Sequence, residues 1–109
     1  MTPAHFELLR RLALNDELAL NQVMSGRRIE PPLLDEKTSA LVRVAAMVAL
    51  ESGGPPSYQW AVDAAHASGA EDEEIVQLLL AVAPIVGVAR VNAAAPNLAS
   101  ALGYSADDL

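Results

Sequence analysis

Residues 44–50 read Val-Ala-Ala-Met-Val-Ala-Leu, and this stretch decides the fold. It lies inside a predicted helix over residues 35–52 and carries no polar residue on any face. A helix without a polar side has no face suited to water, so other helices should surround it. The sequence therefore predicts an all-α protein with this segment at the centre of a domain or of an oligomer.

A hinge, Gly53-Gly54-Pro55-Pro56-Ser57, follows this helix and leads into a second helix predicted over residues 58–68. Two glycines and two prolines fix a bend and bring the start of the second helix close to the end of the first. We therefore look for a site at the hinge. Trp60 is predicted to face inward in the second helix, together with Ala61, Ala64 and Ala65.

The opposite side of that helix carries Gln59, Asp63 and His66. Asp63 and His66 are three positions apart and can touch, which suggests an acid and base pair. A solvated helix side accounts for the same residues more simply.

The rest of the chain adds about four helices and no convincing strand. Helices over 3–12 and 16–24, the second capped by Asn15, are expected to form a peripheral cover, joined to the core by an extended connector through Pro31-Pro32. After residue 71, Pro84 is expected to kink or divide a helix, Gly87 to permit close backbone packing, and Pro96 to make a second break. We predict one domain over 1–109, with peripheral helices and connector in 1–33 and a core in 34–103.

The composition points to self-association. Hydrophobic residues make up 52% of the 109 residues but aromatic residues only 4%. Alanine-rich helices pack closely but bury little area each, so one small domain leaves apolar surface uncovered. We expect a homo-oligomer.

Charge and cysteine content exclude several function classes. The net charge of -7 argues against nucleic-acid and anionic-membrane partners, which need a basic surface. The absence of cysteine removes disulfides, thiolate metal sites and cysteine catalysis. The N-terminus does not read as a secretory signal, and the longest apolar run, 78–89, is shorter than the about 20 residues that span a bilayer. A cytoplasmic, soluble protein is expected.

No standard chemical motif is present. Gly53-Gly54 is followed by prolines and is no phosphate loop, and two histidines 61 positions apart predict no metal site. A triad of Ser57, Asp63 and His66 fails because Ser57 and His66 lie on different turns. We expect no metal and no cofactor.

The order of these segments resembles the carboxymuconolactone decarboxylase and alkylhydroperoxidase D-like family. The resemblance rests on Leu34-Asp35-Glu36-Lys37-Thr38, the apolar helix, the turn and Ala67-Ser68-Gly69-Ala70, followed by Ala83-Pro84, Gly87, Arg90 and Asn92-Ala93. It covers roughly residues 34–95. It implies an all-α helical bundle that assembles into trimers or hexamers, with pockets beside the hinge.

The resemblance also implies that peroxidase members carry Cys-x-x-Cys and a histidine on the second helix, with a glutamate on the helix before. Here the positions that align with that histidine and that glutamate are Ala61 and Ala40, and no cysteine is present. Thiol peroxidase activity is therefore excluded, since it needs a thiolate.

Two hypotheses remain. The first is a non-catalytic oligomeric or small-molecule-binding family member, which the missing histidine and glutamate favour. The second is a non-redox lyase or decarboxylase acting on a small organic acid or lactone, with Glu51 or Tyr58 as proton donor or acceptor. Candidate binding residues for the acid are Arg43, Ser57, Trp60 and Arg90. Convergence of Glu51, Tyr58 and an arginine on one pocket would favour the second.

Overall fold

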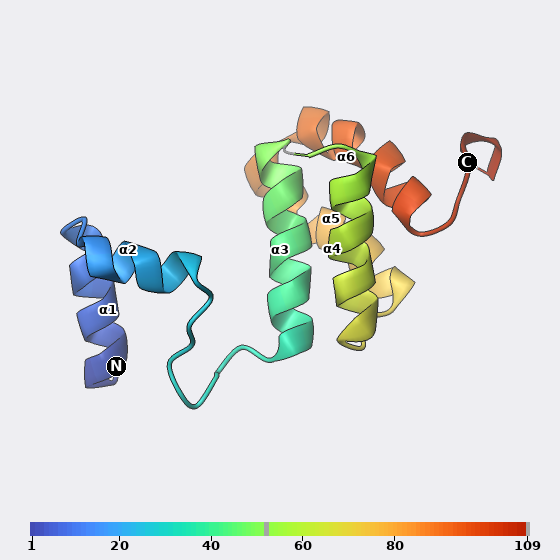
Figure 1. The fold of residues 1–109 in the computed structure, drawn as a ribbon. Helices are drawn as coiled ribbons and strands as arrows, with labels where there is room; N and C mark the ends of the chain where they lie inside the picture. The colour runs from blue at the N-terminus through green and yellow to red at the C-terminus, as the bar shows by residue number, and fades with distance from the viewer. Residues whose placement is uncertain (52, 109) are drawn as a thin grey trace. The chain divides into compact units, whose positions relative to one another are not determined.

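The computed structural model describes residues 1–51 and 53–108, which form six α-helices and a short 3-10 helix without any strand (Figure 1). The all-α prediction with about six helices is confirmed. The chain divides into two compact units, Met1–Leu33 and Leu34–Leu109.

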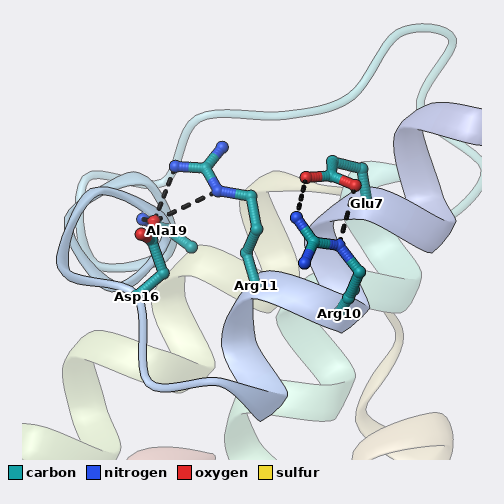
Figure 2. Close-up of polar contacts among 5 residues, drawn as sticks. All are labelled: Glu7, Arg10, Arg11, Asp16 and Ala19. Carbon is teal, nitrogen blue, oxygen red and sulfur yellow. Dashed lines mark hydrogen bonds and ion pairs between the residues drawn. The ribbon is translucent and has the colours of Figure 1, made fainter.

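The first unit is a pair of helices, α1 (Pro3–Ala13) and α2 (Glu17–Met24). Asp16 caps α2, because its Oδ2 accepts a hydrogen bond of 3.0 Å from the backbone N–H of Ala19 and one of 2.6 Å from Arg11 (Figure 2). The prediction that Asn15 is the cap is wrong: Asn15 has φ 58° and forms the turn before it. Arg10 pairs with Glu7 one turn earlier on α1 (Figure 2).

The second unit contains α3 (Glu36–Leu50), α4 (Pro55–Ala67), α5 (Asp72–Val86), α6 (Val88–Ala101) and the 3-10 helix η1 (Ala106–Asp108). α3 and α4 lie side by side and run in opposite directions, and α6 passes across the end at which the hinge joins them (Figure 1). The core lies between α3, α4, α5 and α6, and its largest fully buried side chains are Tyr58, Ile75, Val44, Val48 and Val62.

An ion pair and a capping box join the starts of α3 and α5. Lys37 Nζ lies 2.9 Å from Glu74 Oε2, while Glu74 Oε1 accepts a 3.0 Å hydrogen bond from the backbone N–H of Glu71. One carboxylate therefore both closes the N-terminus of α5 and holds α3 against it.

The apolar stretch of α3 is covered on one side. Val44 and Val48 are fully buried, whereas Ala46 is exposed and Leu50 is 71% exposed. The expectation that neighbouring helices surround this segment is therefore not met within one chain, and its covering by further copies stays a prediction.

The break expected at Pro96 is wrong, and so are the division of a helix at Pro84 and the close backbone packing at Gly87. Pro84 lies inside α5 and Pro96 inside α6, so neither proline divides its helix. The break falls at Gly87, whose φ of 89° ends α5 and starts α6. Apart from its chain neighbours, no described residue has an atom within 4 Å of where a Gly87 Cβ would be, so this glycine serves the turn and not a close approach.

Candidate functional site

The hinge between α3 and α4 is shorter than predicted because α4 begins at Pro55. Pro55 and Pro56 occupy the first turn of α4, where a missing N–H costs nothing. Glu51 ends α3 in the left-handed conformation, φ 50° and ψ 34°, which costs a residue with a side chain roughly 1–2 kcal/mol. Ser52, which the sequence analysis placed in α3, lies outside the described residues.

A cavity of about 210 Å³ lies beside this hinge. Its polar lining comes from three elements: Glu51 from the end of α3, Tyr58 from α4, and Arg90 with Asn97 from α6. Gly53, Ala93 and Ala94 complete it. Glu51, Tyr58 and Arg90 were each predicted as candidates, and the fold brings these three together.

Tyr58 is the buried member of this group, at 2% exposed. Burial raises the pKa of its hydroxyl, and the negative charge of Glu51 raises that pKa further. The hydroxyl is therefore neutral at ordinary pH and is able to donate a hydrogen bond to a ligand. Tyr58 lines the cavity, and no hydrogen bond recorded among the described residues uses its hydroxyl.

Arg90 holds the other side of the cavity. Its Nη1 donates to the backbone carbonyl of Ala49. That carbonyl belongs to the last turn of α3, where carbonyls lack partners within the helix and the helix dipole favours a cation. The contact fixes the guanidinium beside Glu51 and leaves its other N–H groups for a carboxylate.

The remaining candidates lie elsewhere. Ser57 and Trp60 line a second cavity of about 380 Å³ with Met47 and Pro56. Arg43 is exposed on α3 and lines neither cavity. The inward position predicted for Trp60 is wrong: this side chain is 67% exposed, and Tyr58, Ala61, Val62 and Ala65 form the inward face of α4.

Asp63 and His66 do not pair. The carboxylate of Asp63 accepts a 2.8 Å hydrogen bond from Gln59 Nε2, and His66 Nε2 lies 2.7 Å from Asp72 Oδ1. Gln59, Asp63 and His66 are all exposed on α4.

The described residues form no group of three or more histidine, aspartate or glutamate side chains that could hold a metal ion.

Asn97 is the lining residue that the sequence analysis missed. It lies seven positions after Arg90, two helical turns along α6, so the two share one side of the helix. Because a break was expected at Pro96, the sequence analysis did not place Arg90 and Asn97 on one helix.

A third cavity, of about 610 Å³, lies between α5 and α6, and its apolar lining includes Ile75, Leu79, Leu98 and Leu102.

Comparison with known proteins assigns the family. The family model described as "Carboxymuconolactone decarboxylase family" matches residues 18–99, which is most of the chain. The chain belongs to the carboxymuconolactone decarboxylase family. The match begins in α2 and so starts earlier than the 34–95 of the predicted resemblance. Comparisons with curated proteins and with solved structures give no match.

The two positions that the predicted resemblance singled out for polar residues are apolar and buried. Ala40 and Ala61 both lie in the core. The polar groups of this cavity therefore come from other positions, Glu51, Tyr58, Arg90 and Asn97.

None of the helices in the described part of the chain has the length and apolar character of a membrane span.

Proposed function

We propose that this family member binds a small organic acid in the cavity beside the hinge, without redox chemistry and in the cytoplasm. The observation that carries the proposal is the convergence of Glu51, Tyr58 and Arg90 on one cavity. Arg90 supplies a fixed cation for the carboxylate, and Tyr58 supplies a neutral donor.

The cavity also sets the size and character of the acid. Its volume of about 210 Å³ is below the roughly 300–1,000 Å³ of typical drug-sized sites. Glu51 lies on the same cavity and repels a second carboxylate, whereas it accepts a hydrogen bond from a hydroxyl or amino group. The favoured ligand is a small monocarboxylic acid that carries one such donor group.

Binding is tested by calorimetry with a panel of small carboxylic acids, with and without a hydroxyl or amino substituent. Arg90→Gln should weaken the best ligand by about tenfold to a hundredfold, because a hydrogen bond to a charged group is worth roughly 1.5–3 kcal/mol. Arg27→Gln is the matched control, since it removes one exposed arginine from the first unit. Equal weakening by both variants, or no binding by any acid, would refute the proposal.

Arg90→Gln also removes the contact to Ala49, so the folding of this variant needs its own check. The melting temperature of each variant without ligand provides it. Ligand-induced shifts are then compared with each variant's own baseline.

A second candidate function, a non-redox lyase, is favoured by the protonated hydroxyl of Tyr58, which lines the same cavity as Glu51. In a decarboxylation, the bond from carbon to the carboxylate breaks, carbon dioxide leaves, and the electron pair left on carbon takes the proton of Tyr58. Proton NMR of the bound acids in deuterated water tests this function. Tyr58→Phe should abolish product formation and deuterium incorporation, yet retain binding through Arg90.

A further inference from the structure

The cavity between α5 and α6 has the size of a small-molecule site. Its volume of about 610 Å³ falls within the roughly 300–1,000 Å³ of sites that take drug-sized ligands. Its lining comes from the first half of α5, the second half of α6 and the chain that follows α6. It shares no lining residue with the cavity beside the hinge, so the two are separate sites.

The apolar part of this lining comes from both helices. Ile75 and Leu79 are four positions apart on α5, and Leu98 and Leu102 are four positions apart at the end of α6, so each pair forms a row. Ile75 and Leu98 are buried, whereas Leu79 and Leu102 are half-buried. An apolar group placed against these rows leaves water, and its affinity grows with the area it buries.

The charged residues of the lining are all acidic. Asp72 and Glu73 are the first two residues of α5, and Asp108 belongs to η1. Among the residues that the structure describes, no lysine or arginine lines this cavity. Negative charge without a counterion attracts a cation and repels an organic acid, so the occupant differs in charge from the acid proposed for the hinge cavity.

Two of the three carboxylates are suited to hold a cation. The backbone N–H and the hydroxyl of Ser105 donate to Oδ2 of Asp108 at 2.7 and 3.1 Å, which positions this carboxylate and holds its pKa below the ordinary value of 3.8. The side chain of Glu73 is exposed and forms no hydrogen bond or ion pair within the described part of the chain. Asp72, by contrast, has its Oδ1 2.7 Å from His66 Nε2.

Tyr104 adds an aromatic ring to the same lining. Its backbone N–H donates a 2.9 Å hydrogen bond to the carbonyl of Ala99, which fixes the chain where it leaves α6, and its side chain is half exposed. The face of an aromatic ring attracts an organic ammonium group, and this attraction adds to that of the carboxylates.

We propose that the cavity between α5 and α6 binds an amphipathic organic amine. The apolar chain of the amine lies against the rows of α5 and α6, and its ammonium group lies by Glu73, Asp108 and the ring of Tyr104. The apolar lining alone accepts any apolar molecule of this size, whereas the acidic residues select one that carries a positive charge.

NMR titration of the ¹⁵N-labelled full chain with n-hexylamine tests the proposal. The largest shifts should fall in α5, in α6 and in residues 103–108. n-Octylamine should bind about tenfold more tightly, because two further methylene groups leave water. Hexan-1-ol has the same chain without the charge and should bind at least fivefold more weakly than n-hexylamine.

Charge-removing variants locate the ammonium group. Glu73→Gln and Asp108→Asn should each weaken n-hexylamine about threefold to fivefold, and the double variant about tenfold or more. Asp107→Asn is the matched control, because Asp107 is an exposed neighbour that does not line the cavity, and it should bind as the natural chain does. Melting temperatures without ligand check that each variant is folded.

Four results overturn the proposal. They are the absence of binding by both amines, hexan-1-ol binding as tightly as n-hexylamine, equal weakening by Asp107→Asn and Asp108→Asn, and shifts confined to the hinge or to residues 1–33.

Discussion

At the scale of single residues, Tyr58 links the cavity to the stability of the fold. Burial and Glu51 raise the pKa of its hydroxyl above the ordinary value of 10.0, so the folded chain keeps a proton that the unfolded chain loses. The contribution is fully present below pH 10 and is lost as pH rises through the folded pKa. Urea denaturation at several alkaline pH values should therefore show a steeper loss of stability in the natural chain than in Tyr58→Phe.

Tyr104 provides the control for that measurement. It is the only other tyrosine and is half exposed, so Tyr104→Phe should leave the steep alkaline loss in place. Identical alkaline slopes in the natural chain and Tyr58→Phe would contradict the role given to Tyr58.

Gly53 is the residue on which the hinge geometry depends. Its φ is 81°, and a Cβ placed on it would lie 2.6 Å from Ser57 Cβ. Gly53→Ala should cost about 1–3 kcal/mol of unfolding free energy through backbone strain and this clash. Gly54→Ala should cost less, because Gly54 has φ -101° and its added Cβ would approach nothing closer than 3.8 Å. Chemical denaturation of both variants measures the difference, and equal losses would count against the close packing of Gly53.

The two aromatic residues of α4 show what residue patterns leave undecided. The sequence analysis placed Trp60 inward, yet Tyr58 is the buried ring and Trp60 the exposed one. Four of the 13 residues of α4 are alanine, and each buries little area, so periodicity alone fixes the inward direction of this helix poorly. Packing against α3 and α6 sets it instead.

At the scale of elements, the contact between α3 and α5 predicts acid sensitivity. Lys37 and the backbone N–H of Glu71 hold the pKa of Glu74 below its ordinary value of 4.5. The stabilisation is therefore present above pH 4.5 and is lost as pH falls through the lowered pKa. Glu74→Gln keeps an oxygen for the Glu71 hydrogen bond but removes the charge. Thermal melts of this variant should show a smaller fall in melting temperature on acidification than the natural chain shows.

Glu73→Gln is the control for Glu74, since Glu73 is an exposed neighbour with no resolved ion pair in the described residues. Its acid dependence should match that of the natural chain. A Glu74→Gln variant as acid-sensitive as the natural chain would refute the role of the ion pair.

The start of α2 makes a second prediction at this scale. Asp16 accepts from the backbone N–H of Ala19 and pairs with Arg11 (Figure 2). Asp16→Ala removes both contacts and should speed exchange of the Ala19 amide proton severalfold, because that N–H loses its acceptor. Asp16→Asn keeps an acceptor oxygen and should show much of the original protection. Exchange monitored by NMR compares them, and equal protection in all three chains would exclude capping by Asp16.

The start of α3 was predicted correctly from its capping residue, whereas the cap Asn15 and the breaks at prolines were not. Asp35 accepts from the N–H of Thr38 and caps α3 as expected. Pro84 was expected to kink or divide its helix and Pro96 to break one. Pro84 instead lies near the C-terminal end of an undivided α5, and Pro96 lies within α6, where neighbouring helices hold the backbone. Tertiary packing offsets the lost hydrogen bond at such positions, and that packing is not visible in a local pattern.

At the scale of the whole molecule, the two units should differ in stability. Among the described residues of the first unit only Ala19 is buried, whereas the second unit contains the entire hydrophobic cluster. Amide protons of α1 and α2 should therefore exchange by local opening, well before those of α3 to α6. Hydrogen exchange followed by mass spectrometry checks this, and equal protection of the two units would refute it.

The sequence by itself determined the helical class, the hinge, the absence of thiol chemistry and the family, because these follow from composition, capping residues and the order of segments. Only the tertiary structure decided which polar residues meet. Glu51, Tyr58, Arg90 and Asn97 lie on three helices, and the packing of α6 over the hinge brings them to one cavity. The packing of the helices also leaves Arg43 and Trp60 exposed. Burial depends on how each helix is rotated about its axis against its neighbours, and the sequence of one helix does not determine that rotation.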